Sequence, residues 1–423
     1  MMPETEAGRR WLVAGFPALR HRNFRLFVVG QGLSLVGTWM QSVALGWLVF
    51  QLSGSPFALG AVAACGYLPI FCLAPAAGAV ADRVPKRQLI LVTQTLAMLL
   101  ALVLAVLVAT DRVTTSLVAV FAACLGTVSA FDIPTRQAFI VEMVGASDLP
   151  NAIALNSSIF NGARLVGPAV AGILVGEVGL APCFFINAAT YLAVLWALAR
   201  MQLPRAARPA AADAPRPRLG EGLRYVWQHP GLRTLLLLMG VVGSLGLQYT
   251  VLMPAFARVV LVTDARGFGW LVTAQGLGAV CRALWLASRR HTRVERRRHL
   301  LMGLAVFAAA VGGLGLTREF GVALALQALA GYGMIGYTAT TNTSIQLLVD
   351  DRFRGRVMGL HAVMFLGTAP LGSLVLGAVA RSFGVPTAFL FSGTVSALAA
   401  GWLALRLRRL AREGAPGPAK SAA

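Results

Sequence analysis

Long apolar runs separated by short charged turns constrain this chain more than any other feature. Stretches of about twenty residues carry almost no charge, and the acidic and basic residues gather between them. An α-helix needs ~20 apolar residues to cross a hydrocarbon layer of ~30 Å. The composition agrees, because 57% hydrophobic and 13% charged residues are unlike a soluble domain. The pattern predicts an all-α membrane protein with many spans.

Twelve spans are predicted, in two groups of six around a linker rich in Pro, Ala and Arg. The proposed units are a segment 1–25, a first six-helix bundle 26–201, a linker 202–233, a second six-helix bundle 234–407 and a tail 408–423. The two groups repeat weakly, since 132–176 resembles 334–377 and each contains a proline in a Gly-rich helix, Pro168 and Pro370. Such a repeat is typical of two parallel bundles around a central cavity.

The basic residues predict the orientation. With both termini in the cytoplasm, 30 of the 37 Lys and Arg residues lie on the inner side. The outside turns hold five basic residues, and the spans hold two, Arg164 and Arg282. Because cytoplasmic loops of membrane proteins are enriched in Lys and Arg, the inverted topology is rejected. The net charge of +21 then serves orientation and contact with the lipid bilayer, and nucleic-acid binding is not expected.

The loop after the second span carries a motif. Gly78 is followed by Asp82 and Arg83, and then by Lys86 and Arg87. This spacing resembles the loop signature of the major facilitator superfamily of secondary transporters, with Pro85 where that family usually has Gly. The resemblance implies the major facilitator fold and a conformational latch. In that latch Asp82, placed at the start of the third span, pairs with Arg136 and meets the eleventh span near Gly355. The second half lacks the acid, so only the first loop is expected to latch.

A second motif narrows the resemblance. Gly167, Pro168 and Gly172 in the fifth span look like the helix-packing signature of drug–proton antiporters, with one closing glycine in place of two. The stretches 132–139 and 151–172 are similar to the branch that contains the enterobactin exporter and other secretion-type facilitators. The resemblance implies export of a siderophore- or drug-like molecule across the bacterial inner membrane, driven by protons. Among the acids and histidines near span ends, Asp132 is the candidate for proton coupling, ahead of Glu142, Glu177 and His361.

Polar side chains in spans one, four, five, seven and ten are the candidates for the substrate cavity. The resemblance implies that spans one, four, seven and ten line it, and amides and tyrosines among apolar neighbours suit an amphiphilic solute. The candidates are Gln31, Thr38, Gln41, Thr127, Ser129, Asn161, Arg164, Gln248, Tyr249, Gln327, Tyr332 and Tyr337.

Arg164 stands out because it lies about 20 Å along the fifth span from Asn151, at 1.5 Å per residue. An arginine that faces lipid at this depth costs at least ~2.5 kcal/mol, so its face should look into the protein. The sequence offers no midplane acid to pair with it. Either carbonyls and amides such as Asn161 satisfy the guanidinium, or an anionic substrate supplies the missing charge.

Other classes of protein find little support. The chain has no metal-ligand spacing, phosphate-binding loop or nucleophile motif, so an enzyme, a metal site and a cofactor are not expected. The five cysteines lie in apolar spans and are interpreted as small buried hydrophobes. A lipid facilitator for lysophospholipid and a non-transporting scaffold or receptor stay open as alternatives, and we expect a monomer.

Overall fold

The computed structural model describes residues 16–202, 219–288 and 292–413. This part of the chain is helical and contains no strand. The first half comprises η1 (Pro17–Arg20), α2 (Arg22–Ser53), α3 (Pro56–Arg83), α4 (Lys86–Ala109), α5 (Thr115–Glu177) and α6 (Ala181–Arg200). The second half comprises α7 (Leu219–Gln228), α8 (Pro230–Val241), η3 (Val242–Gly246), η4 (Leu247–Leu252), α9 (Met253–Ala255), η5 (Phe256–Val260), α10 (Ala265–Ala287), α11 (Arg293–Leu314), α12 (Phe320–Leu348), η6 (Asp351–Phe353), α13 (Arg354–Ala362), η7 (Val363–Gly367), α14 (Ala369–Phe383) and α15 (Val385–Glu413).

Eleven helical segments of the described chain are long and apolar enough to cross a membrane, and one of them counts twice. Helix α5 has 63 residues, or about 95 Å at 1.5 Å per residue, three times the hydrocarbon thickness. It breaks at Gly145, whose φ of 70° and ψ of 177° are not helical. Glycine tolerates this conformation because it has no side chain. The predicted fourth and fifth spans are the two arms of α5, which brings the total to twelve in two bundles.

At one end of the molecule the two bundles meet through glycines. A Cβ added to Gly172 of α5 would lie 3.0 Å from the Cα of Gly269 in α10. A Cβ added to Gly60 of α3 would lie 2.3 Å from the carbonyl oxygen of Ser373 in α14. Small residues let helices in membranes approach this closely. An ion pair between Glu177 and Arg266 also joins the bundles at this end, which carries the predicted outside turns. We call these contacts the outer seam.

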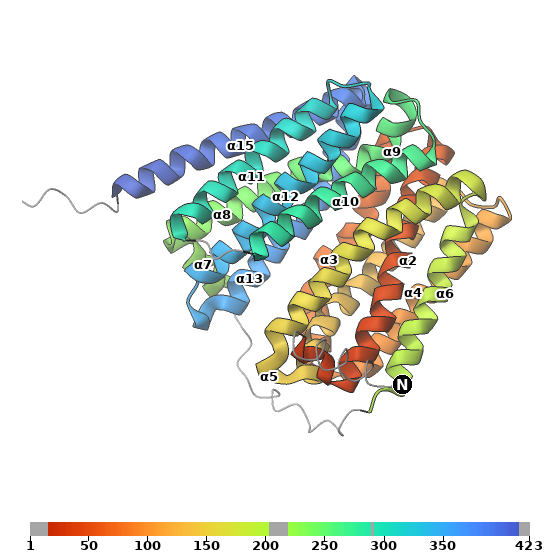
Figure 1. Cartoon of the computed structure of the whole chain (residues 1–423), viewed down its shortest axis with the longest axis horizontal. Helices are drawn as coiled ribbons and strands as arrows, with labels where there is room; N and C mark the ends of the chain where they lie inside the picture. Colours follow the sequence, from red (N-terminus) through yellow and green to blue (C-terminus); the bar gives the residue numbers. More distant parts are fainter. Residues whose placement is uncertain (1–15, 203–218, 289–291, 414–423) are drawn as a thin grey trace, which may run out of the picture.

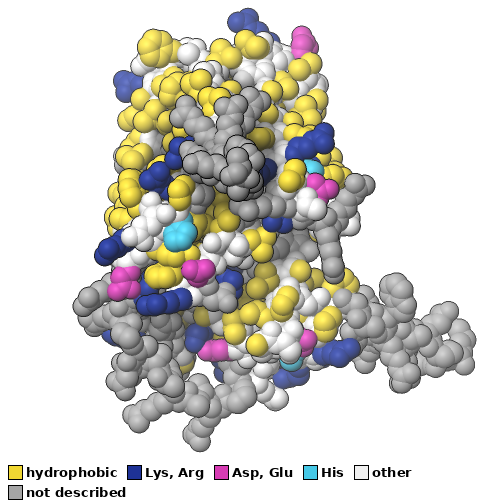
Figure 2. Space-filling view, turned by 90° about the vertical axis from the view of Figure 1, so that its left-hand side faces the viewer, with side chains coloured by type: hydrophobic (Ala, Val, Ile, Leu, Met, Phe, Trp, Pro, Cys, Tyr) yellow, Lys and Arg dark blue, Asp and Glu magenta, His cyan; other side chains and the backbone are white. Residues whose placement is uncertain are grey.

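At the other end the bundles diverge (Figure 1). The end of α5 near α9 and α10 lies against the second bundle, whereas α13 and the start of α2 stand apart. Nothing lies within 4 Å of a Cβ added to Gly78 or Gly355. Figure 2 shows charged side chains gathered toward the middle and lower part of one face, below a mainly hydrophobic upper flank. This end carries the turns predicted to be cytoplasmic.

One prediction about the loop motif is wrong. Asp82 lies in the last turn of α3, which ends at Arg83, and not at the start of the next helix, which begins at Lys86. Only Val84 and Pro85 lie between the two helices, and Pro85 is the N-cap residue of α4. The side chain of Asp82 lies outside the described atoms.

Candidate substrate cavity

A cavity of about 440 Å³ lies between the two bundles, beneath the outer seam. Helices α2, α3 and α5 line it from the first bundle, and η4, α9, α10 and α12 line it from the second. Most of its wall is apolar, with Val, Leu, Ile, Ala and Phe side chains. A few polar or amphipathic groups interrupt this wall, namely Trp39, Ser42, Tyr67, Ser129, Arg164, Thr250, Gln275 and Gln327. Apolar walls with a few polar groups are typical of sites for small molecules.

A chain of hydrogen bonds crosses the second bundle beside this cavity and ends on Arg164. The Arg164 Nη2 donates to Gln275 Oε1 at 3.2 Å, and Gln275 Nε2 donates to the Tyr249 hydroxyl at 2.8 Å. That hydroxyl donates to Gln327 Oε1 at 3.1 Å, and Gln327 Nε2 contacts Met253 Sδ at 2.8 Å. Arg164 is thus the point where the first bundle reaches the polar interior of the second.

The guanidinium of Arg164 has no carboxylate partner among the described residues. Its Cζ lies 5.6 Å from the centroid of the Trp39 ring, and its Nη2 lies 3.8 Å from Met334 Sδ. Its Nε is buried, and no atom in the described part of the chain accepts a hydrogen bond from it. Asn161, expected as a partner, donates instead to the carbonyl of Ser157 at 2.8 Å. The amide that satisfies Arg164 in part is therefore Gln275, across the bundle interface.

The structure brings only some of the predicted cavity residues together. Ser129, Arg164 and Gln327 line the cavity, and Tyr249 belongs to the hydrogen-bonded chain behind it. The others bond within their own bundle or helix. In side-chain pairs, Gln41 accepts from Asn187, Tyr332 accepts from Arg282, and Tyr337 donates to Met239 Sδ. In side-chain to backbone bonds, Gln248 donates to the carbonyl of Gly243, Thr38 to that of Ser34 and Thr127 to that of Ala123. Gln31 is buried, and its Oε1 has no partner among the described atoms.

Five polar or amphipathic residues of the cavity wall were not predicted, namely Trp39, Ser42, Tyr67, Thr250 and Gln275. The sequence offers a signal for two of them. Trp39 lies one residue after the predicted Thr38, and Gln275 is an amide in an apolar span, the same signal that selected Gln327. The eighth span was not expected to line the cavity, and Gln275 was missed for that reason.

Comparison with known proteins now identifies the family. The transmembrane secretion effector family of the major facilitator superfamily matches residues 13–417. The chain belongs to this family. A relative from Mycolicibacterium fortuitum, the multidrug efflux pump Tap, is 27% identical over 84% of this chain and 88% of its own length. The staphyloferrin A transporter of Staphylococcus aureus is 26% identical over 87% of this chain and 92% of its own length. Family and relatives are transporters and not enzymes.

Solved structures of other transporters share the fold of this secretion effector. A bacterial homologue of the human lysosomal transporter Spinster matches with a TM-score of 0.70 and 14% identity, over 93% of this chain and 98% of the other. The nucleoside transporter NupG, as its D323A mutant, matches with a TM-score of 0.69 and 14% identity, over 92% and 99%. The prediction of a major facilitator fold is confirmed.

In this secretion effector the candidate coupling residue, Asp132, is buried in the first bundle. Its Oδ1 accepts hydrogen bonds from Thr93 Oγ1 at 2.8 Å and from Gln94 Nε2 at 2.9 Å. Its Oδ2 lies 2.7 Å from the Nε of Arg136, one helical turn away. Arg136, expected to pair with Asp82, thus has Asp132 as its described partner. Thr93, Gln94 and Arg136 together hold the Asp132 carboxyl group inside the first bundle.

The other candidates for proton coupling have different surroundings. Glu142 pairs with Lys86, and Glu177 pairs with Arg266 across the outer seam. Both carboxyl groups are about half exposed, at 45% and 57%. His361 keeps a buried Nε2 without a partner among the described atoms. Asp132 is therefore the acid of this set that lies deepest in the protein.

The antiporter-like motif of the fifth span lies at two helix crossings. A Cβ on Gly167 would lie 2.6 Å from the Cβ of Trp39 in α2, inside the first bundle. Gly172 contacts Gly269 across the outer seam, and the carbonyl of Pro168 lies 2.8 Å from where a Cβ on Gly269 would be. The motif thus keeps α5 close to α2 and to α10 at once.

Proposed function

We propose that this transporter exports a small amphiphilic anion, siderophore- or drug-like, across the bacterial inner membrane by proton antiport and alternating access. The observation that carries the proposal is Arg164, a cation at the wall of the central cavity without a described counter-charge. A buried arginine in a membrane protein is costly unless it is paired. A carboxylate- or catecholate-bearing substrate would supply the pair while it occupies the cavity.

The chemistry of the guanidinium favours an anion over a cation. Arginine carries five N–H donors in a planar fork, which matches a carboxylate bidentately. The Gln275 side chain accepts from Nη2 of Arg164, and the Nε of Arg164 has no acceptor among the described residues. The names of the relatives support a siderophore-like or drug-like substrate, because one relative is a staphyloferrin A transporter and the other a multidrug efflux pump.

The arrangement of the bundles supports alternating access. The outer seam is closed by glycine contacts and by the Glu177–Arg266 pair, while the opposite ends diverge. With the predicted orientation this conformation faces inward, so a cytoplasmic substrate can reach the cavity. Opening outward requires the seam to separate and the inner ends to meet.

Replacing Arg164 by Gln tests the proposal. Hydrogen bonds to charged groups contribute ~1.5–3 kcal/mol, so the export efficiency for an anionic siderophore probe should fall by about tenfold to a hundredfold. Arg112→Gln, in an exposed outside turn, is the matched control and should export at the wild-type rate. The measurement is efflux of labelled probe from energised vesicles with equal amounts of inserted protein.

Three results would contradict the proposal: wild-type export by Arg164→Gln, a cationic substrate, or flux of labelled lysophospholipid without flux of any anion. The last would favour a lipid facilitator. The absence of any flux from proteoliposomes would favour a scaffold or receptor.

A further inference from the structure

The inner ends of the two bundles repeat each other in sequence but not in charge. Arg-Val-Pro-Lys-Arg at 83–87 corresponds to Arg-Val-Glu-Arg-Arg at 293–297, so Lys86 matches Arg296 and Arg87 matches Arg297. In the register that pairs Pro168 with Pro370, Glu142 corresponds to Ser344. The acid opposite Lys86 in the first bundle is therefore absent from the second.

In the first bundle this place is filled, and an acid pairs with one of its two basic residues. Phe24, Phe27 and Phe139 are fully buried there, and the rings of Phe27 and Phe139 meet edge to face at 6.2 Å. Lys86 pairs with Glu142. Arg87 donates from Nε to the carbonyl of Leu198 at 2.8 Å and from Nη2 to that of Ala199 at 3.1 Å.

In the second bundle the same place is hollow and basic. The stretch from His21 corresponds to the stretch from His229, so leucines replace the two phenylalanines, Leu232 for Phe24 and Leu235 for Phe27. A cavity of about 460 Å³ opens there between α8, α11, α12 and α15, with leucines as half of its lining residues. Its volume is within the ~300–1,000 Å³ of small-molecule sites.

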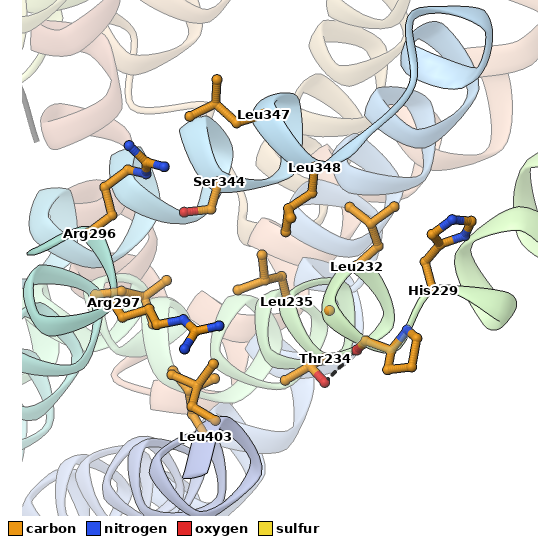
Figure 3. Close-up of a pocket in the computed structure, with 14 residues that line it drawn as sticks. His229, Leu232, Thr234, Leu235, Arg296, Arg297, Ser344, Leu347, Leu348 and Leu403 are labelled. Atoms are coloured by element: carbon orange, nitrogen blue, oxygen red, sulfur yellow. Dashed lines mark hydrogen bonds between the residues drawn. The ribbon is translucent and has the colours of Figure 1, made fainter. Parts of the chain in front are cut away.

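Two arginines of α11 stand at this cavity, which we call the inner pocket (Figure 3). Arg296 and Arg297 lie on the α11 side, and the Ser344 hydroxyl faces them from α12. No hydrogen bond or ion pair joins Arg297 to another residue in the described part of the chain. The pocket therefore combines an apolar interior with two arginines, and no Asp or Glu is among the residues that line it.

We infer that the inner pocket binds an anionic phospholipid of the inner leaflet, with its phosphate at Arg296 and Arg297 and part of an acyl chain among the leucines. Three of the helices that line the pocket begin or end close to it, α8 at Pro230, α11 at Arg293 and α12 at Leu348. In the predicted orientation this is the depth of the cytoplasmic headgroups. Basic pockets between helices on this side bind anionic headgroups, and each buried methylene adds ~0.8 kcal/mol.

Lipid binding to the purified full-length protein tests the inference. Native mass spectrometry should show that phosphatidylglycerol binds at least about fivefold more tightly than phosphatidylcholine. Arg297→Gln should remove this preference, because it deletes a headgroup contact. Leu235→Phe should weaken binding of the acyl chain, because it restores the aromatic side chain that fills the first bundle. Arg298→Gln, an exposed neighbour outside the pocket, is the matched control and should bind as the wild type does.

Equal binding of the two lipids, or unchanged phosphatidylglycerol binding in both pocket variants, would overturn the inference. A benzoylphenylalanine at Leu347 locates the occupant directly. Its photocrosslink to phosphatidylglycerol supports the lipid, whereas a crosslink to residues 203–218 or 414–423 of this chain would show that the protein fills its own pocket. These readouts do not depend on transport.

Discussion

Two arginines lie inside spans, and the protein accommodates them differently. Arg282 is only 2% exposed, and its Nη1 donates to the Tyr332 hydroxyl at 2.9 Å. Its Cζ lies 4.5 Å from the ring centroid of Trp285 and 4.9 Å from that of Tyr332, so two aromatic faces stabilise the charge. Arg164 has one aromatic face at 5.6 Å and borders a cavity. The Nε and Nη2 of Arg282 have no hydrogen-bond partner among the described atoms, but Arg282 does not line the central cavity. Arg164 lines it and is the arginine with access to a solute.

Asp132→Asn tests proton coupling at the scale of one residue. An amide keeps the shape and can still accept from Thr93 or Gln94, but it cannot exchange a proton and leaves Arg136 without its counter-charge. The part of export that an imposed pH gradient stimulates should disappear. The readout is efflux from proteoliposomes with and without that gradient.

Asp111→Asn is the control for this substitution. Asp111 lies in an exposed turn with a φ of 54°, a conformation that Asn also tolerates. Retained gradient stimulation in the Asp132 variant would leave that carboxylate with a structural role only.

Single residues of the site were predictable where their chemistry conflicts with a lipid environment. The charged side chain of Arg164 is the least compatible with lipid, and the polar side chains of Tyr249 and Gln327 are the next least compatible. The partner Gln275 was not predictable from its own span, because its role depends on which helices meet across the bundles. Tyr332 and Tyr337 have the same composition signal as Tyr249, yet they bond elsewhere. Residue type predicts burial of a polar group but not the neighbour that satisfies it.

At the scale of helices, the outer seam depends on glycines that leave no room for a side chain. Gly172→Ala should push α5 away from α10, because the new Cβ would lie 3.0 Å from the Gly269 Cα and 3.1 Å from the Ala265 carbonyl oxygen. Overpacking of this kind costs ~1–3 kcal/mol, enough to shift the population toward the outward-open state by about fivefold or more. Spin labels at the exposed positions Val178 and Val262, beside the seam, should report a longer distance.

Gly162→Ala is the matched control on the same helix, because nothing lies within 4 Å of its added Cβ. An unchanged distance distribution in the Gly172 variant would show that the seam does not hold this conformation.

The spans themselves were predictable from hydropathy, and their ends were not. The first bundle was expected to begin at residue 26, whereas its first long helix, α2, begins four residues earlier, at Arg22. Helices extend past the apolar run because their polar ends emerge from the hydrocarbon. The error on Asp82 has the same origin, since hydropathy marks where lipid ends and not where the last helical turn ends.

The orientation of the whole molecule is testable with reporter fusions. Fusions at Gly54, Asp111, Asp264 and Glu319 should report the outside, and fusions at Lys86 and Arg352 the cytoplasm, because this arrangement places most basic residues inside. A report from the opposite side at any of these six sites would refute the twelve-span topology.

The conformational cycle is also a property of the whole molecule. Asp82→Asn should leave insertion intact and slow transport, because the loop motif implies that Asp82 joins the bundles when their inner ends close. In the present conformation those ends are apart. Glu295→Gln, in the corresponding loop of the second bundle, should transport normally. Counterflow rates compare the two, and equal rates would argue against a latch at Asp82.

The uncompensated charge of Arg164 has an electrical consequence. No Asp or Glu is among the described residues of the cavity wall, so the anion proposed as substrate would leave the cavity without an accompanying protein charge. An elementary charge that crosses the membrane exchanges ~2.3 kcal/mol per 100 mV with the membrane potential. A cell interior that is electrically negative therefore drives a monovalent anion outward, and an incoming proton adds a second charge in the same sense. Export through this transporter would be driven by the membrane potential as well as by the pH gradient.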